Sequence, residues 1–189
     1  GPEKVQSYEL GYIGIFLKNR LNLGGQIYYM TVDDTEMFDT RITSLVPFRM
    51  RTTFMNRGQS IARGVESNVQ YRFRNHQVYV NHTYEVVTNM IGDVASLGSN
   101  PGSTPRHKFN IGGIAALPFN FSAGLNVGYK DGYKIFSTQT SLDAPAYWRV
   151  DARIAYRPVR FMEIFVAGQN LAVEQHVEFP GAVEVPRTF

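Results

Sequence analysis

The sequence contains no cysteine and a single tryptophan among its 189 residues. The absence of cysteine excludes a disulfide-stapled scaffold, a cysteine nucleophile and a metal site built from thiolates. No run of about 18 apolar residues is present, so the chain has no candidate transmembrane helix. It also lacks a basic block, because 19 basic and 16 acidic residues are spread along the chain to a net charge of +3. We therefore expect no nucleic-acid partner.

What the chain does contain is a regular alternation of apolar and polar side chains, clearest over residues 120–129. Successive side chains of a β-strand point to opposite faces, so this alternation predicts a strand with one apolar and one polar face. The apolar members are Phe121, Ala123, Leu125, Val127 and Tyr129, and the polar or small members are Asn120, Ser122, Gly124, Asn126 and Gly128.

Charged side chains in other alternating segments keep to the polar parity. Glu66 does so within 64–73, and Asp151 and Arg153 do so within 150–157. An Arg or Lys at the lipid midplane costs a transmembrane barrel about 2–4 kcal/mol, so charges confined to one parity are expected of a water-filled lumen. We predict that Glu66, Asp151 and Arg153 face such a lumen.

The alternation divides the chain into eight complete strands and the beginning of a ninth. Short connections alternate with long ones, as in outer-membrane barrels with short periplasmic turns and long extracellular loops. The expected strands cover residues 5–17, 21–33, 52–73, 77–91, 106–117, 120–136, 146–157, 161–173 and 185–189. The expected short connections lie at residues 18–20, 74–76, 118 and 158–160, and the long ones at 34–51, 92–105, 137–145 and 174–184.

These patterns predict an all-β fold, an antiparallel up-and-down transmembrane β-barrel. The apolar content of 43% and the mean hydropathy of −0.22 are typical of a barrel in which every second side chain of a strand faces water. They suit a soluble antiparallel sheet with one buried face as well. Aromatic residues make up 13% of the chain and could form girdles at two membrane interfaces or fill a soluble core.

Six short motifs in order along the chain resemble the β-barrel domain of TonB-dependent outer-membrane receptors. Three of them read PE-x-x-x-SYE-x-G, N-x-G followed by G-V-E, and P-x-H, and the others read Y-x-x-x-D-x-R, N-L and P-R-T-F. They occur at Pro2–Gly11, Asn56–Glu66, Pro105–His107, Tyr147–Arg153, Asn170–Leu171 and Pro186–Phe189.

The resemblance implies that residues 1–189 are the C-terminal portion of a larger barrel, with about eight to nine of its strands. Barrels of plugged transporters have as many as 22 strands. The family's plug domain, its TonB-contacting segment and its N-terminal strands would then lie outside this sequence. The implied location is the outer membrane of a Gram-negative-type bacterium, in contact with lipid and lipopolysaccharide.

The implied function is TonB-dependent uptake of a scarce large nutrient such as a ferric siderophore. The plug domain and TonB would be partners through the missing N-terminal part. After Asn170-Leu171 the chain departs from the family pattern, so the motifs indicate no substrate subclass.

No residue pattern indicates catalysis, a cofactor or a bound metal, so we do not expect an enzyme. Arg49 and Arg51 lie beside aromatic residues and are candidates for contacting an anionic chelate, although contact with lipopolysaccharide phosphates fits them equally. His176 and Glu178 are candidate ligand contacts in an expected loop, or else a solvated pair. The three lumen charges could meet the plug or pair across neighbouring strands.

Two other classes of function remain open on the sequence. The chain could be a complete small outer-membrane barrel of eight strands with a structural or adhesive role, which requires its first strand to pair with one of its last. It could instead be a soluble β-sandwich binding module, which requires the apolar parity to be buried between two sheets.

Overall fold

The computed structural model describes residues 2–91, 94–95, 104–136, 141–179 and 181–189. Within these residues every regular element is a β-strand, and no helix is long and apolar enough to span a membrane. The strands are β1 (Lys4–Phe16), β2 (Leu21–Leu45), β3 (Phe48–Phe73), β4 (His76–Ile91), β5 (Val94–Ala95), β6 (His107–Ala116), β7 (Phe121–Lys130), β8 (Tyr133–Phe136), β9 (Ser141–Ala144), β10 (Tyr147–Val159), β11 (Met162–Gly168), β12 (Gln175–His176) and β13 (Val185–Pro186).

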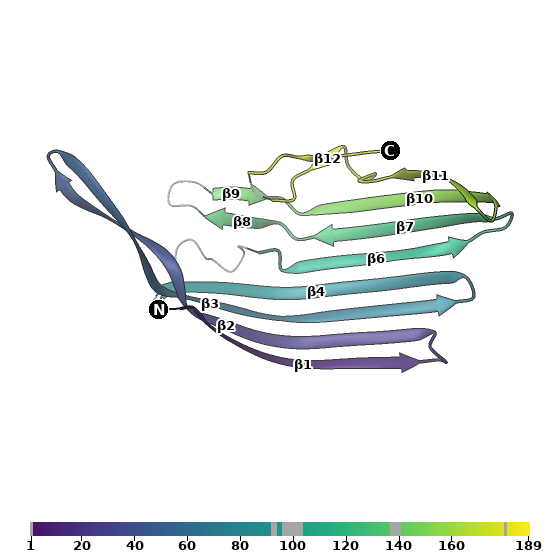
Figure 1. The fold of residues 1–189 in the computed structure, drawn as a ribbon, viewed down its shortest axis with the longest axis horizontal. Helices are drawn as coiled ribbons and strands as arrows, with labels where there is room; N and C mark the ends of the chain where they lie inside the picture. The colour runs from purple at the N-terminus through teal and green to yellow at the C-terminus, as the bar shows by residue number, and fades with distance from the viewer. Residues whose placement is uncertain (1, 92–93, 96–103, 137–140, 180) are drawn as a thin grey trace.

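The long strands form one antiparallel sheet in the order β1-β2-β3-β4-β6-β7-β10-β11 (Figure 1). Consecutive long strands are neighbours throughout, which is the up-and-down topology that the sequence predicted. The four expected short connections are tight turns at one end of the sheet, and the strand ends from which the other connections start lie at the opposite end (Figure 1). Among the described residues β1 and β11 are the two edges and do not pair with each other, so the sheet is open.

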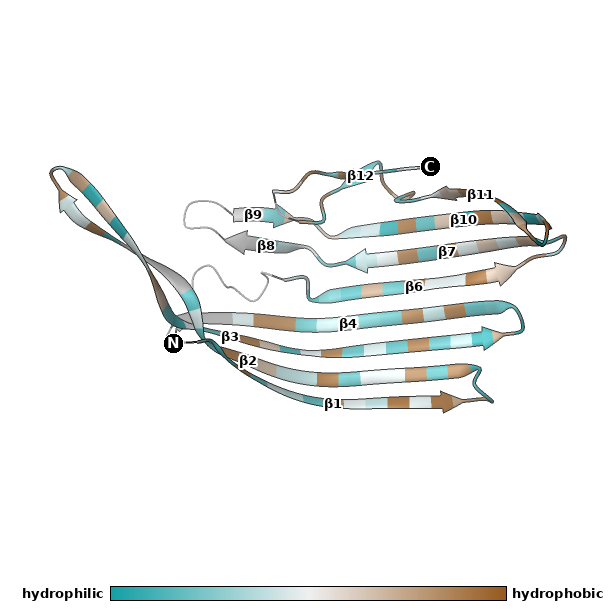
Figure 2. Cartoon of the chain, viewed as in Figure 1, coloured by the Kyte–Doolittle hydropathy of each residue, from teal (hydrophilic) through white to brown (hydrophobic). Residues whose placement is uncertain are grey.

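One face of the sheet is apolar and exposed, and the strand register shows why. Residues directly opposite each other share a face, and the register pairs Val127 with Val150 and Leu125 with Ala152. Figure 2 shows the resulting alternation of hydrophobic and hydrophilic residues along the strands. Leu125 keeps 54% of its surface exposed, and no second layer of sheet covers this face in the described part of the chain. The soluble β-sandwich alternative is therefore wrong.

Aromatic side chains gather on this apolar face near both ends of the strands. Tyr129 packs on Trp148 with ring centroids 4.8 Å apart, and Phe121 packs on Tyr156 at 4.6 Å. Eight residues separate Phe121 from Tyr129, which is about 26 Å along a strand at about 3.3 Å per residue. Barrels in membranes carry aromatic girdles on either side of an apolar band about 25 Å tall. Strands in such barrels are tilted by about 35–45°, so the two aromatic pairs lie about 19–22 Å apart across the membrane, close to the spacing of such girdles.

On the polar face, two tyrosines each cross a glycine on the next strand. Tyr28, Gly64 and Glu85 lie directly opposite one another on β2, β3 and β4, and the Tyr28 hydroxyl donates to Glu85 at 2.8 Å. Tyr79 on β4 lies over Gly112 on β6 in the same way and donates to Asn126 on β7 at 2.9 Å. Each tyrosine thus joins three strands, because the glycine leaves room for its ring.

The expected long loop at 34–51 is wrong. β2 and β3 continue far beyond the sheet as a twisted two-stranded ribbon whose turn lies at Val46-Pro47 (Figure 1). Pairs such as Thr40↔Thr52 and Ile42↔Met50 keep the two arms in register. Threonine and isoleucine favour strands, and these pairs extend the hairpin past the point where the charged residues at 33–36 suggest that it ends.

Three expected strands in the C-terminal half also end differently. The strand expected at 120–136 breaks after Lys130, where the Asp131 carboxylate accepts bonds from the Tyr129 hydroxyl at 2.8 Å and the His107 backbone N–H at 2.9 Å. The strand expected at 161–173 ends at Gly168, since Asn170 adopts a left-handed backbone with φ of 56°. Of the strand expected at 185–189, the structure forms only Val185–Pro186 and a bridge from Thr188 to Gln169. The expected connection at 92–105 lies mainly outside the described residues.

Candidate functional site

Three cations line the polar face at the end of the sheet where the long connections lie. Lys108 of β6 and Lys130 of β7 lie directly opposite each other, and Tyr147 of β10 is opposite Lys130 on its other side. Arg149 follows two residues after Tyr147 and so points to the same face. We refer to Lys108, Lys130 and Arg149 as the rim cluster.

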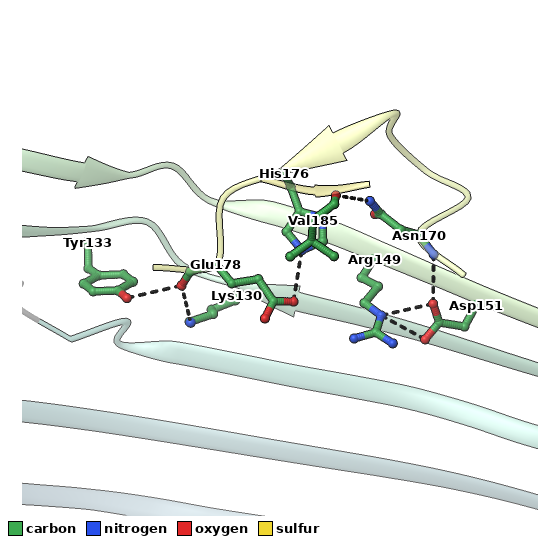
Figure 3. A network of polar contacts seen from close by, with 8 residues as sticks. All are labelled: Lys130, Tyr133, Arg149, Asp151, Asn170, His176, Glu178 and Val185. Carbon is green, nitrogen blue, oxygen red and sulfur yellow. Dashed lines mark hydrogen bonds and ion pairs between the residues drawn. The ribbon is translucent and has the colours of Figure 1, made fainter. Parts of the chain in front are cut away.

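Arg149 is anchored by a carboxylate on its own strand (Figure 3). Its Nε lies 3.0 Å from both carboxylate oxygens of Asp151. The Asp151 Oδ1 also accepts the backbone N–H of Asn170 at 3.0 Å, and the Asn170 amide donates to the Val185 carbonyl at 3.1 Å. Asp151 therefore fixes both Arg149 and the left-handed turn at Asn170.

The backbone carbonyl of Glu178 receives two donors from the neighbouring strands. The Lys130 Nζ donates at 3.1 Å and the Tyr133 hydroxyl donates at 3.2 Å (Figure 3). Burial raises the pKa of the Tyr133 hydroxyl, so this side chain remains a donor at neutral pH. The segment around Glu178 is thus held against the sheet by Lys130 and Tyr133.

His176 is buried beside the same segment, with 7% of its surface exposed. Its ring stacks on Tyr147 with centroids 4.1 Å apart, and its Nε2 lies 3.1 Å from the Glu178 carboxylate. The Nδ1 atom is buried without a hydrogen-bond partner. The interpretation of His176 and Glu178 as a solvated pair is therefore wrong for His176, which burial and stacking hold in place.

The structure places the three expected lumen charges on the polar face and shows cross-strand partners for two of them. Glu66 on β3 accepts the Gln26 amide of β2 at 3.0 Å. Arg153 on β10 pairs with Glu163 on β11 and lies over the Phe165 ring with Cζ 4.4 Å from its centroid. The third charge, Asp151, makes the contacts described above. Pairing across strands thus accounts for Glu66 and Arg153, and contact with a plug stays a prediction.

Arg49 and Arg51 lie on the β3 arm of the ribbon, where both are exposed. The ribbon projects away from the sheet, so these arginines lie apart from the rim cluster (Figure 1). The sequence-derived candidates therefore fall into two groups, with His176 and Glu178 beside the cluster and Arg49 and Arg51 remote from it.

Sequence reasoning missed Lys108, Lys130, Tyr133 and Tyr147. Each belongs to a different segment, and only the register of β6, β7 and β10 brings Lys108, Lys130 and Tyr147 into line. Lys108, Lys130 and Tyr147 lie on the polar face within one residue of the end of β6, β7 or β10, which the expected strand bounds of 106–117 and 120–136 did not mark.

The site offers three cationic side chains, hydroxyl groups and aromatic rings, with Lys108 paired to Glu85 at 3.7 Å and Arg149 paired to Asp151 at 3.0 Å. Such groups bind anions, because charge-assisted hydrogen bonds are about twice as strong as neutral ones. Within the described residues, no group of three or more potential metal-ligating carboxylates and histidines is present. The geometry thus favours an anionic ligand over a bare cation at the rim cluster.

The chain belongs to the family described as TonB dependent receptor-like, beta-barrel, which its sequence matches over residues 1–171. This membership and the open apolar-faced sheet identify the fold as part of a transmembrane β-barrel of the bacterial outer membrane. No curated protein sequence matches the chain.

Solved structures with the same fold include outer-membrane receptors from several bacteria. The ferric-catecholate import receptor Fiu of E. coli K12 is 20% identical with a TM-score of 0.73, covering 94% of this chain and 24% of its own. The ferric yersiniabactin uptake receptor FyuA of Yersinia pestis is 17% identical with a TM-score of 0.72. The match covers 98% of this chain and 27% of FyuA. The FrpB iron transporter of Neisseria meningitidis is 11% identical with a TM-score of 0.73. The match covers 98% of this chain and 30% of FrpB. The chain therefore spans under a third of each of these proteins.

Proposed function

We propose that this chain is the C-terminal portion of the barrel of a TonB-dependent receptor, whose plug and N-terminal strands lie outside the sequence. The receptor takes up an anionic nutrient chelate, in the first place a ferric siderophore, across the outer membrane. Uptake depends on movement of the plug driven by TonB. The proposal rests on the family membership of the chain and on the rim cluster, and it assigns no enzymatic activity.

The rim cluster is the observation that carries the choice of an anionic ligand. Lys130 currently donates to a backbone carbonyl, that of Glu178, at 3.1 Å. A negatively charged ligand oxygen is a stronger acceptor than a neutral carbonyl, so it can compete for this ammonium. Tyr133 is 7% exposed and the Tyr147 ring is covered by His176, so the two tyrosines position the segment around Glu178 beside the cluster. Similarity to receptors whose names specify ferric siderophores gives further support.

The remaining candidates take roles around this site. His176 and Glu178 lie in the segment that covers the cluster and contact the ligand from above. Arg49 and Arg51 make a first, more distant contact from the ribbon, or bind lipopolysaccharide phosphates there. Glu66, Asp151 and Arg153 face the plug in the complete receptor, in addition to their partners within the sheet.

The test compares two lysine variants of the full-length receptor. Lys130→Gln removes the charge from the rim cluster, whereas Lys134→Gln removes an exposed lysine whose partner, 3.2 Å away, is Asp143. Iron-55-labelled ferric siderophores of catecholate, hydroxamate and mixed type serve as ligands for the purified receptor. One charge-assisted hydrogen bond contributes about 1.5–3 kcal/mol, so we expect about 10- to 100-fold weaker binding for Lys130→Gln.

For Lys134→Gln we expect wild-type affinity. We also expect the strain that carries this variant to keep growing with the bound chelate as its iron source. Two results would contradict the proposal. One is a receptor that binds none of the ferric chelates, and the other is an equal loss of affinity in the two variants.

A further inference from the structure

Two histidines on the apolar side of the sheet lie next to each other on neighbouring strands. They take no part in the site described above. His82 lies on β4 and His107 is the first residue of β6. The register places His82 opposite Phe109 and His107 opposite Tyr84, so the two histidines are diagonal neighbours on one face. Their rings are stacked with centroids 5.4 Å apart and planes 17° from parallel.

The two rings approach each other nitrogen to nitrogen and share a hydrogen bond. His82 Nε2 lies 3.1 Å from His107 Nδ1. Two imidazoles that bind one metal ion at about 2.0–2.1 Å have their nitrogens about 2.9 Å apart at a right angle and about 3.3 Å apart at the tetrahedral angle. The observed separation falls between these values. The nitrogens lie on the line between the ring centres and point at each other, so both rings must turn by about 40° and give up their hydrogen bond to bind one ion.

His107 is fixed in position by its surroundings. Its backbone N–H donates to the Asp131 carboxylate at 2.9 Å, and the Asp131 N–H donates back to the His107 carbonyl at 2.9 Å. The Tyr84 ring lies 4.9 Å from the His107 ring, between centroids. This anchoring holds the His107 backbone in place, so only side-chain torsions have to change when an ion binds.

The pair lies at the long-connection end of the apolar face, level with the girdle formed by Tyr129 and Trp148. Phe109, the opposite neighbour of His82, is also opposite Tyr129 in the adjoining pair of strands. The girdle position lies at the membrane–water interface, where water can supply the remaining ligands of an ion. His107 is exposed there.

We propose that His82 and His107 form a binding site for one divalent transition-metal ion on the outer surface of the barrel wall. Imidazole ligands suit copper, zinc and nickel, and copper(II) has the highest affinity in the divalent series. The site takes Cu²⁺ most tightly, with two protein nitrogens and water molecules as ligands. It is separate from the rim cluster, and it does not depend on the receptor transporting a siderophore.

The experiment uses the full-length polypeptide that carries this chain, extracted from outer membranes in mild detergent and titrated with CuCl₂. Single variants His82→Asn and His107→Asn each remove one ligand. His76→Asn is the matched control, since His76 lies on the same face of β4 at the opposite end of the sheet. Assembly of each variant is checked by the heat-dependent mobility of the folded barrel.

We expect a Cu²⁺ site of micromolar affinity in the wild type and in His76→Asn, and at least tenfold weaker binding in His82→Asn and His107→Asn. Electron paramagnetic resonance of the wild type loaded with one equivalent of Cu²⁺ should show two coordinated imidazole nitrogens. This spectrum needs no variant and so remains decisive if a variant does not assemble. Cu²⁺ binding that is unchanged in His82→Asn, or a spectrum without two imidazoles, would overturn the proposal.

Discussion

At the scale of single residues, two tyrosine–glycine contacts on the polar face do most to fix the strands in register. A Cβ added to Gly64 would lie 2.6 Å from the Tyr28 hydroxyl oxygen, and one added to Gly112 would lie 2.5 Å from Tyr79 Cζ. Real side chains do not approach so closely, so only glycine fits under either ring. The two tyrosines then reach polar partners two strands away. Such contacts oppose slippage, which by one residue would exchange the two faces of a strand.

Substituting Gly112 tests this arrangement. Gly112→Ala forces Tyr79 off its position and strains its bond to Asn126, so we expect a loss of about 1–3 kcal/mol of unfolding free energy, the usual cost of overpacking. Gly124→Ala is the control on the neighbouring strand β7, because its new Cβ meets nothing closer than 3.8 Å. Urea unfolding of the detergent-solubilised barrel measures both. Equal stability of the two variants would show that the Tyr79 contact does not constrain the sheet.

The parity of the strands could be predicted from single residues, and the tyrosine contacts could not. Tyr79 and Val87 fall on the polar parity and made the alternation of β4 look imperfect in the sequence. The structure shows that Tyr79 is there to cover Gly112 and to donate to Asn126. A period-two pattern predicts which face of the sheet Tyr79 points to. It does not predict that Gly112, 33 residues further along the chain, lies opposite Tyr79, because that depends on the register of β4 and β6.

At the scale of elements, the ribbon formed by the ends of β2 and β3 is the largest departure from the sequence prediction. Local alternation is weak there, because Arg41 lies opposite Arg51 and bulges interrupt the pairing near Thr35. The hairpin persists because each arm supplies backbone partners to the other. The local sequence pattern therefore predicted where β2 leaves the main sheet, but it did not predict the two-stranded ribbon that continues beyond that point.

A disulfide introduced across the ribbon tests whether it forms. Ile42→Cys with Met50→Cys places two cysteines directly opposite each other, where Cβ atoms lie about 4.5–5.5 Å apart and need a small inward shift to form a disulfide. The native sequence has no cysteine to compete. Under mild oxidation we expect the tryptic peptides on either side of Arg49 to stay joined in a mass spectrum. Ile42→Cys with Phe54→Cys is the out-of-register control, and efficient joining in that variant would show that the ribbon is not paired as described.

The rim cluster depends on how elements meet and was beyond the reach of sequence reasoning. The sequence marked Asp151 as lumen-facing and His176 and Glu178 as candidate loop contacts, and the structure places all three beside the rim cluster. It could not show that Lys130 and Tyr133 converge on the Glu178 carbonyl, since these residues are more than 40 positions away. Convergence of this kind follows from strand order.

At the scale of the whole molecule, the open sheet with an exposed apolar face explains why the chain belongs in a membrane. Val166 is 74% exposed and Leu10 is 70% exposed, at opposite edges of the same apolar face. The unpaired edges β1 and β11 need further strands, since lipid does not tolerate unpaired backbone groups. Among the described residues β1 and β11 do not pair, so this part of the chain does not form the closed barrel that the eight-stranded alternative requires. The fold class was predictable because alternation, charge parity and connection lengths all agreed.

Charged substitutions on the two faces of β7 test which face contacts lipid and which faces the lumen. Leu125 lies midway between the two aromatic girdles, and we expect Leu125→Arg to cost about 2–4 kcal/mol and to lower the amount of assembled receptor in outer membranes. Gly124→Glu places a charge on the adjacent polar-face residue, directly opposite Arg153, and should assemble close to the wild-type level. The measurement is the fraction of receptor with heat-dependent gel mobility. Equal assembly of both variants would contradict the assignment of faces.

The central claim is that these 189 residues are part of a much larger receptor barrel, and the size of the native polypeptide tests it most directly. An antibody raised against the ribbon between residues 34 and 58 would be applied to outer membranes of the source cell. Structural relatives of which the chain covers 24–30% predict a heat-modifiable band three to four times larger than 21.4 kDa. A membrane band near 21 kDa would contradict the account.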